Sequence, residues 1–565
     1  MYSVEKFSLS LANLIYCFIP NPVLMRAVKF VSLLLIIVFN TFISFALPQN
    51  ENPDSICHHK VILDKDSKIL SWMTPQANAY DHFLHLRWNF VKTRAEMSPG
   101  PAPRSNYPLY YFYCELKEKD GKIIQSGPMN DIGEKIPNWF ENARLYYAYT
   151  GDESVMTIMK NFIDYTIKHG TSAPDFAWPN FPYTTTNSGD TLFRGYTNSK
   201  RLALHEIQVD HASEMGLTYY RMYLYSGDKK YLDAALNVAN TLIKYVKTGS
   251  ATHSPWPYRV IMDSGKETSE YGANWSGAYM LFDHFINANI GNIKAYKEAQ
   301  AKIRQFIADF PMKTGYWTDG HSDTDVKSNT YKSNLSNSNA VLCMFDYPEF
   351  NHQWKENIPK MIKWTEDYFI FRKAPDEPST VWGANIVGEQ DGFNFKMDYQ
   401  TARYGAECAR WYAVSGDETY KDKAFRSLNW VTYCNDKTGF AFESPVSKGI
   451  QSWWSDCYGE CPRMFYQAFA GIPEWAPPAE NHILYSGGIL KEVSYAPKEI
   501  RYTVTAKNGT EYLRLAFRPS SVVINGAELS LVSQDGKEGY QLKNLGSGDY
   551  SVKVYHSKAG KVVIK

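Results

Sequence analysis

Six short stretches of the sequence combine ionisable, amide and aromatic residues, which together can bind and transform a sugar. They are residues 137–139, 205–211, 271–275, 334–339, 398–404 and 453–458. The imidazole of His211 and the phenol of Tyr399 can transfer protons. The amide of Asn274 and the guanidinium of Arg403 can bind a carboxylate. We therefore predict that these four residues are catalytic.

Other residues in or beside these stretches are predicted to contact the substrate. Trp and Tyr offer flat faces to sugar rings, while Asn, Asp and His offer hydrogen bonds. Asn385 is included because residues 382–385 repeat the aromatic-Gly-Ala-Asn pattern of residues 271–274. The full set is Asn138, Trp139, His205, Asp210, Tyr271, Trp275, Asn385 and Trp454. Helix capping is the alternative role for Asn138 and Asp210.

A repeated hinge indicates how the chain positions these stretches. Three helix-periodic runs end in a Ser or Thr, a Gly and an Asp, at residues 150–152, 226–228 and 415–417. Gly can end a helix in the left-handed conformation, and the following Asp can cap the next helix. Each hinge therefore predicts an antiparallel pair of helices. Residues 289–292 form a fourth, degenerate copy.

The spacing predicts about six such hairpins. First helices are expected near 137–149, 208–225, 274–288, 336–345, 398–414 and 456–470, and a helix near 76–95 completes the last pair. Repeated hairpins of this kind can close into an α/α toroid, and an open helical solenoid is the alternative. In a closed ring the first helices all start at one end, which we call the mouth. The six stretches should therefore gather at the mouth.

The composition changes after residue 471. The Pro-rich segment 472–480 predicts a stiff linker, and segments within residues 481–565 alternate apolar and polar residues between Gly and Asn turns. We therefore expect a mainly α fold: an α/α toroid over residues 75–471, which would be the catalytic domain, followed by a small antiparallel β-sandwich-like domain over residues 481–565.

The N-terminal segment 1–46 has the features of a secretion signal. We take Met25 as the true start, because Arg26 and Lys29 precede the apolar run 31–39 and a small-x-small site ends at Ala46. The mature protein is predicted to be periplasmic or secreted, with no membrane span after signal removal. An uncleaved N-terminal anchor is the alternative.

The charged residues are balanced, with 60 Lys and Arg against 59 Asp and Glu. A general nucleic-acid-binding protein would be basic, so we expect no nucleic-acid partner. The sequence contains no phosphate loop, dinucleotide fingerprint or His-Glu-x-x-His motif, so we expect no organic cofactor and no metal. A divalent cation, such as calcium at Asp323 and Asp325, is the alternative.

The hinge repeats and the layout of residues 75–564 resemble those of the α/α-toroid carbohydrate-active enzymes. This group includes polysaccharide lyases with a toroid and a β domain, and six-hairpin uronyl hydrolases. The chain looks most like secreted uronate-processing proteins of Bacteroidetes, including the oligosaccharide dehydratase type of ulvan degradation. The resemblance implies an acidic oligo- or polysaccharide substrate.

The lyase pattern of this group implies β-elimination on a uronic acid. A base removes the C5 proton, the C4 substituent leaves, and a 4,5-unsaturated uronyl end remains. By this resemblance His211 is the base, Tyr399 is the acid, and Asn274 with Arg403 binds the carboxylate, where charge must be stabilised. Such a carbon–oxygen lyase is a polysaccharide lyase when a sugar leaves, and a dehydratase when hydroxide leaves.

Two alternative functions stay open. An inverting glycoside hydrolase would use two carboxylates about 6.5–9.5 Å apart. Asp210 and Asp398 are the natural pair, and the substitutes are Glu206, Asp391 and Asp456. A non-enzymatic glycan-binding protein would use the aromatic residues alone. Elimination is preferred, because the predicted mouth is rich in Tyr, His, Asn and Arg.

Overall fold

The three predicted hinges turn the chain as the sequence indicates. In the computed structural model, Gly151, Gly227 and Gly416 adopt left-handed conformations, with φ of 78°, 76° and 70°. The N–H of each donates to the carbonyl four residues earlier, which ends the helix. Asp228 and Asp417 each accept a hydrogen bond from a backbone N–H at the start of the next helix. Each hinge therefore ends one helix and starts another.

The structure describes residues 58–95, 115–119, 122–126, 129–187, 203–318, 332–371, 381–391, 396–445, 452–453 and 455–565. The predicted signal segment 1–46, Trp454 and the loop with Asp323 and Asp325 lie outside these ranges. Each helix within them is too short or too polar to span a membrane.

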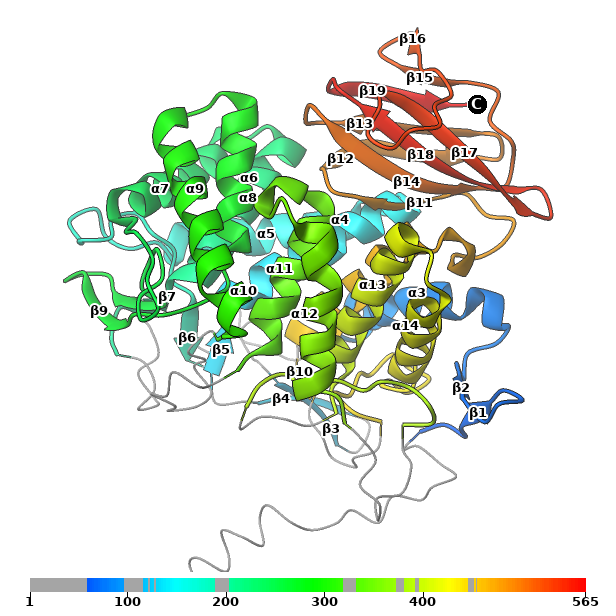
Figure 1. The fold of residues 1–565 in the computed structure, drawn as a ribbon, viewed down its shortest axis with the longest axis horizontal. Coiled ribbons are helices and arrows are strands. Elements are labelled where there is room, and N and C mark those ends of the chain that lie inside the picture. The colour runs from blue at the N-terminus through cyan, green and yellow to red at the C-terminus, as the bar shows by residue number, and fades with distance from the viewer. Residues whose placement is uncertain are drawn as a thin grey trace, which may run out of the picture. The chain divides into compact units, whose positions relative to one another are not determined.

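Six helices form an inner ring, and Figure 1 shows α4, α6, α8, α11 and α13 from the side. In chain order they are α4 (Ile132–Thr150), α6 (Val209–Ser226), α8 (Ser276–Ala288), α11 (Asn334–Asp346), α13 (Asp398–Ser415) and α15 (Cys461–Gly471). Each packs against the next, and α15 packs against α4. The π-helical segment η5 (Ser455–Glu460) leads into α15 and also packs against α4. The ring is therefore closed, which excludes the open solenoid.

Six outer helices each pack against an inner partner. They are α3 (Ala79–Phe90), α5 (Ser154–His169), α7 (Lys229–Tyr245), α9 (Ile293–Asp309), α12 (Trp354–Tyr368) and α14 (Glu418–Val431). In α7 the buried residues Tyr231, Ala235, Val238 and Leu242 recur at helical spacing, which makes one apolar face. Helix α3 comes first in the chain yet packs against α15, the last inner helix. The predicted α/α toroid is thus confirmed.

Short helical segments complete this part of the chain. They are η1 (Gln76–Asn78), η2 (Val91–Ala95), α10 (Pro311–Thr314), η4 (Pro348–Phe350) and η6 (Pro473–Trp475).

Short sheets set the helix starts at the mouth. Strand β5 (Met129–Asp131) pairs with β6 (Thr185–Asn187) and runs directly into α4. Because of this strand, α4 begins at Ile132, earlier than the predicted start at Pro137. Strand β7 (Glu206–Gln208) likewise runs directly into α6. The remaining strands here are β8 (Arg259–Ile261) and β9 (Lys266–Ser269), which continue the sheet of β7; β1 (Ile62–Leu63) with β2 (Ile69–Leu70); and β10 (Ser452–Trp453), β3 (Glu115–Lys119) and β4 (Lys122–Ser126).

The C-terminal strands form two antiparallel sheets that share one apolar core. The first, in spatial order, is β11 (His482–Ser486), β14 (Gly509–Leu515), β18 (Asp549–His556) and β17 (Gly539–Gly546). The second is β12 (Leu490–Ala496), β13 (Glu499–Val504), β19 (Gly560–Ile564), β15 (Val522–Ile524) and β16 (Ala527–Glu528). Ile483, Leu513 and Val552 of the first sheet meet Ile500 and Val562 of the second in this core. The strands therefore form the expected β domain, beside the ends of α4 and α15 (Figure 1).

Candidate active site

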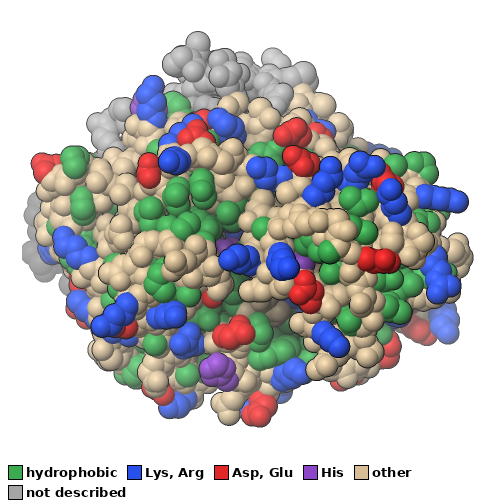
Figure 2. Space-filling view, turned by 90° about the horizontal axis from the view of Figure 1, so that it is seen from above, with side chains coloured by type: hydrophobic (Ala, Val, Ile, Leu, Met, Phe, Trp, Pro, Cys, Tyr) green, Lys and Arg blue, Asp and Glu red, His purple; other side chains and the backbone are tan. Residues whose placement is uncertain are grey.

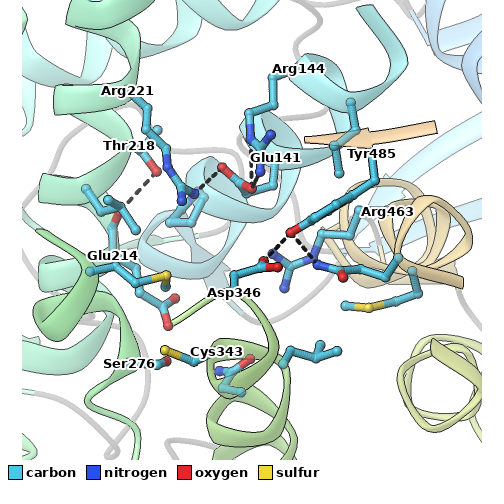
Figure 3. A pocket seen from close by; sticks show the side chains of 18 residues that line it. Glu141, Arg144, Glu214, Thr218, Arg221, Ser276, Cys343, Asp346, Arg463 and Tyr485 are labelled. Carbon is cyan, nitrogen blue, oxygen red and sulfur yellow. Dashed lines mark hydrogen bonds and ion pairs between the residues drawn. The ribbon is translucent and has the colours of Figure 1, made fainter. Parts of the chain in front are cut away.

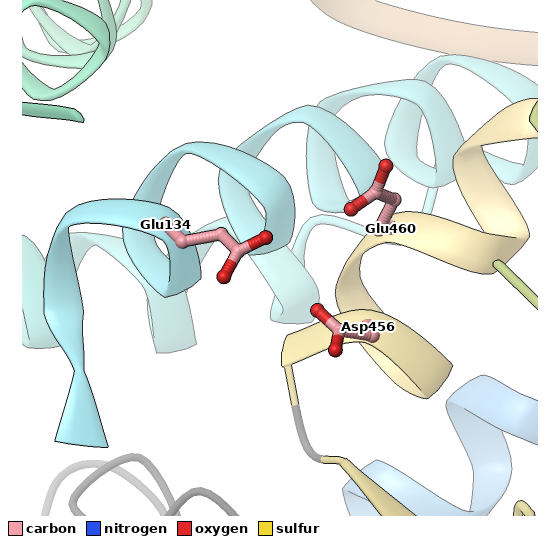
Figure 4. A group of neighbouring side chains, drawn as sticks. All are labelled: Glu134, Asp456 and Glu460. Atoms are coloured by element: carbon pink, nitrogen blue, oxygen red, sulfur yellow. The ribbon is translucent and has the colours of Figure 1, made fainter. Parts of the chain in front are cut away.

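Three carboxylates converge at the mouth, where the ring closes. Glu134 lies in the first turn of α4, and Asp456 and Glu460 lie on η5. One oxygen atom from each lies within 4.8 Å of the others, and the three side chains point toward one another (Figure 4). We call Glu134, Asp456 and Glu460 the carboxylate trio. The trio thus brings together α4, the first inner helix, and η5, which leads into the last inner helix, α15.

Glu460 is already neutralised by protein groups. Arg403 donates its Nε–H to Oε1, and Asn138 donates from Nδ2 to Oε2 at 3.2 Å. A second guanidinium nitrogen of Arg403 donates to Asn339 Oδ1 at 2.7 Å. Burial and the nearby Arg463 lower the pKa of Arg403 to about 9. Arg403 and Asn138 therefore lie at the predicted place, but their donors bind protein groups, Glu460 above all.

Glu134 has an unusual protonation equilibrium. Burial, followed by the charges of Asp456 and Asp131, raises its pKa well above the usual value, and His211 partly opposes this. Two carboxylates close together cannot both ionise freely, because their charges repel. Glu134 therefore holds its proton more tightly than an isolated glutamate does.

His211 is buried at the start of α6 and faces acidic groups. Its Nδ1 lies 3.5 Å from Asp131 Oδ1. Burial lowers the pKa of His211, but the carboxylates of Asp210, Asp131 and Glu134 raise it by more, so the net pKa lies well above the usual value. The imidazole is therefore protonated at neutral pH. A protonated imidazole donates a proton or binds an anion, which differs from the role of base that the resemblance implied.

Tyr399 is the second residue of α13 and is also buried. Burial raises its pKa well above the usual value, as do the charges of Glu389, Asp456, Glu443 and Glu134. The phenol is therefore neutral and carries its proton. Its hydroxyl has no hydrogen-bond partner among the described residues, so it is available to donate to a bound molecule.

Asn274 belongs to the same neighbourhood but is occupied. Its Nδ2 donates to Glu214 Oε1 at 3.1 Å, and its Oδ1 accepts from Ser276 Oγ at 3.1 Å. Glu214 in turn raises the pKa of Arg403 through its charge. Asn274 and Arg403 thus connect to one network, in which both bind protein carboxylates.

Two of the predicted substrate-binding tryptophans lie in the core of the toroid. Trp139 and Trp275 are fully buried, with their rings at 5.7 Å from Trp88 and 5.2 Å from Trp256. These two indoles are core side chains, because an apolar ring without exposed surface cannot stack on a ligand. Trp454 lies outside the described residues.

The other predicted contacts also have protein partners. Tyr271 packs against Phe306 and donates to the carbonyl of Tyr316 at 3.4 Å. His205 lies 2.6 Å from the hydroxyl of Tyr183, and Asn385 donates to the hydroxyl of Tyr404 at 2.8 Å. These residues hold loops and helices together. Asp210 is buried beside His211 and contributes its charge there.

Asp210 and Asp398, the predicted hydrolytic pair, are both buried. Asp398 is fully buried and lies 3.4 Å from Arg87 in an ion pair beneath the mouth. Among the substitutes, Glu206 accepts a hydrogen bond from Thr268, and Asp391 pairs with Lys332 at 3.9 Å. Asp456, the last substitute, is the one that belongs to the carboxylate trio.

Sequence reasoning missed several acidic residues of the site, namely Glu134, Glu214, Glu389, Glu443 and Glu460. Glu134 escapes detection because the predicted helix begins at Pro137, which leaves Glu134 in a loop. The sequence feature that could have revealed Glu134 is an acidic residue in the first turn of a helix, because α4 starts about one turn before the predicted start. Glu460 lies on the π-helical turn that precedes α15, a feature that hydrophobic periodicity does not reveal.

A small cavity lies among the inner helices, and Arg463 lines it (Figure 3). It has a volume of about 100 Å³ and is lined by charged groups. Arg463, whose guanidinium lies 3.8 Å from Glu460, is at the trio, and Glu141 is held by Arg144 and Arg221. Burial raises the pKa of Glu141, but the two arginines lower it to about 2. This volume fits a few water molecules but is too small for a sugar ring.

The carboxylate trio is also where a metal ion could bind. Among the described residues it is the one group of three His, Cys, Asp or Glu side chains with ligand atoms this close. However, both oxygens of Glu460 are engaged by Arg403 and Asn138, which leaves Glu134 and Asp456 as ligands. Two carboxylates fit a weakly held, largely hydrated cation.

No protein-family model and no curated protein matches the sequence. Among solved structures, the chain is similar to cellobiose 2-epimerase from Spirochaeta thermophila, with 8% identity, a TM-score of 0.49, and coverage of 72% of this chain and 98% of that chain. An unsaturated glucuronyl hydrolase specific for heparin has 11% identity, a TM-score of 0.43, and coverage of 70% and 96%. A polysaccharide lyase has 14% identity, a TM-score of 0.42, and coverage of 69% and 53%. These are carbohydrate-active enzymes, the group that the sequence resembles.

Proposed function

We propose that the protein is a carbon–oxygen lyase that cleaves uronic-acid-containing saccharides by β-elimination. The observation that carries this proposal is that a buried imidazole and a buried phenol at the mouth both interact with the charge of one carboxyl group. The imidazolium of His211 and the neutral phenol of Tyr399 lie on different inner helices, and both interact electrostatically with Glu134.

In this mechanism His211 binds the uronate carboxylate. Removal of the C5 proton drives negative charge onto that carboxylate, and a fixed positive charge stabilises it most as the charge develops. A cation is needed here, because the surrounding carboxylates would otherwise repel the substrate. Arg403 and Asn274 act indirectly, by holding Glu460 and Glu214.

Glu134 is the base and Tyr399 the acid. A carboxylate whose pKa is raised is a stronger base in its ionised form, and its pKa lies closer to the working pH. The phenol of Tyr399 gives its proton to the oxygen that leaves C4. The C5–H and C4–O bonds break and the C4–C5 double bond forms. Glu134 accepts the proton from C5, and Tyr399 supplies the proton to the leaving oxygen.

The direct test is a Tyr399→Phe variant assayed on uronate-containing oligosaccharides by the absorbance of the conjugated product near the ultraviolet edge. We expect the rate of elimination to fall by about 10²- to 10⁴-fold, the contribution of a positioned proton donor. The matched control is Tyr404→Phe on the same helix, since the hydroxyl of Tyr404 bonds Glu366 and Asn385 instead. Equal losses in both variants, or a fully active Tyr399→Phe, would contradict the assignment.

A second candidate is glycoside hydrolysis, which the close pair Glu134 and Asp456 favours. Retaining hydrolases place two carboxyl groups about 5–5.5 Å apart, and inverting ones about 6.5–9.5 Å apart. The oxygens of this pair lie within 4.8 Å, which is nearer to the retaining arrangement. Hydrolysis would release reducing sugar without ultraviolet absorbance, and Asp456→Asn would abolish it. A glycan-binding protein without activity would release neither product.

A further inference from the structure

A second and larger hollow lies at the opposite end of the inner helices. It is a groove of about 620 Å³ between the C-terminal ends of α6, α8 and α11 and the β domain. Figure 2 looks onto this side of the molecule and shows the hollow near its middle. Ligand sites for small molecules commonly have volumes of about 300–1,000 Å³, so the groove is large enough for a short oligosaccharide.

Tyrosine rings form much of the groove wall. Tyr223 and Tyr347 come from the toroid and Tyr512 from the β domain, and all three are half-buried. The hydroxyls of Tyr223 and Tyr512 have no hydrogen-bond partner among the described residues. Tyr223 can therefore offer an apolar face and a free hydroxyl to a ligand. Tyr512 offers its hydroxyl, because Arg410 and Lys553 lie over its ring at 5.7 and 5.5 Å from the ring centre.

The polar groups of the groove carry little free positive charge. Burial and the nearby Arg221 lower the pKa of His284 to about 3, so its imidazole is neutral. Asp346 is paired with Arg410 at 2.9 Å and accepts a hydrogen bond from Tyr485. The one Lys or Arg side chain in the lining is Lys507, which is exposed. A polyanion would therefore find few cations here, whereas a neutral ligand rich in hydroxyls finds both donors and acceptors.

The wall of the groove is preformed. The guanidinium of Arg410, on the toroid, lies 5.1 Å from the ring centre of Tyr485 and 5.7 Å from that of Tyr512. The bond from Tyr485 to Asp346 fixes the two parts of the chain at the same place. A site that is already ordered loses less conformational entropy when it binds its ligand.

We propose that this groove is an accessory binding site for a neutral oligosaccharide of two or three pyranose units. A sugar ring stacks on Tyr223, and the sugar hydroxyl groups bond the hydroxyls of Tyr223 and Tyr512, the neutral His284 and Asn287. The site is separate from the mouth and does not depend on the reaction proposed there.

The test is isothermal titration calorimetry of the full chain with cellotriose, xylotriose and, as an acidic contrast, trigalacturonate. We expect at least one neutral trisaccharide to bind, and Tyr223→Ala to weaken its binding about tenfold, since a ring contact is lost. The matched control is Tyr368→Ala, an exposed tyrosine at the end of α12 outside the groove, which should leave binding unchanged.

The mouth variant Tyr399→Phe distinguishes the two sites. Binding of the neutral trisaccharide should be the same in this variant as in the unchanged protein, whether or not elimination is lost. The proposal is overturned when neither neutral trisaccharide binds at millimolar concentration, when Tyr223→Ala and Tyr368→Ala have equal effects, or when Tyr399→Phe abolishes binding. Preferential binding of trigalacturonate in the groove would also overturn it.

Discussion

Glu134 and His211 lie near the starts of neighbouring inner helices, and each alters the other's protonation. The carboxylate of Glu134 raises the pKa of His211, and the imidazolium lowers the pKa of Glu134. Residue types alone make His211 a candidate base. Its buried position among Asp131, Asp210 and Glu134 instead favours the cation, which is why we propose a carboxylate as the base.

The charge on His211 predicts a pH dependence of stability. Its pKa in the folded protein is raised above 6.5, so its ion pairs stabilise the fold fully below pH 6.5 and are lost as pH rises through the folded pKa. We expect His211→Gln to remove this contribution. It amounts to about 1.4 kcal/mol for every tenfold increase in the proton affinity of the imidazole on folding. Urea unfolding at a series of pH values measures it.

The experiment compares the free energy of unfolding of His211→Gln with that of the unchanged protein above pH 6.5. Glu134 also has a raised pKa and weakens the fold as it ionises, so the unchanged protein alone cannot separate the two groups. Stability profiles of His211→Gln and the unchanged protein that run parallel above pH 6.5 would refute a raised pKa of His211.

Among the elements, the hinges and short strands decide where each inner helix starts and ends. The left-handed glycines end α4, α6 and α13 at one end of the ring. Strands β5 and β7 run directly into α4 and α6 at the other end. Because both ends are set by backbone geometry, the first turns of the helices meet at the mouth with little freedom.

Substitutions of Gly416 test how much a hinge glycine contributes to the free energy of unfolding. A Cβ atom added there would meet no atom within 4 Å, so a substitution changes only the backbone energy. We expect Gly416→Ala to lower the free energy of unfolding by about 1–2 kcal/mol, the cost of a left-handed conformation for an L-residue. Gly416→Asn should cost less, because Asn tolerates this conformation, as Asn289 does in the fourth hinge. Equal losses for Ala and Asn in urea unfolding would contradict this explanation.

Across the whole described chain, the toroid and the β domain share buried contacts. The ring of His482 stacks on Tyr149 at 3.9 Å, and the hydroxyl of Tyr495 donates to the carbonyl of Ala148. Ala148, at the end of α4, belongs to the apolar core of the β domain. These contacts predict that the two parts unfold as one cooperative unit.

Tyr495→Phe tests that coupling with a built-in reporter. Fourteen of the 15 Trp residues precede residue 472, so tryptophan fluorescence reports mainly the unfolding of the toroid. The variant leaves Ile483 N–H and the Ala148 carbonyl without their partner, which should cost about 1–3 kcal/mol. We expect the urea midpoint of the fluorescence transition to fall. Tyr540→Phe in the same domain is the control, and an unshifted midpoint for Tyr495→Phe would show that the two parts unfold separately.

Local sequence patterns are sufficient to predict the hairpins, the ring and the β domain. Hinges at residues 150–152, 226–228 and 415–417 depend on backbone preferences that act over a few residues, so they are readable locally. The set of side chains that meet at the mouth follows instead from the folded arrangement. Glu134 and Asp456 are more than 300 residues apart in the chain and become neighbours because the ring closes. Burial and pairing of charges depend on such long-range contacts, which residue type and spacing do not contain.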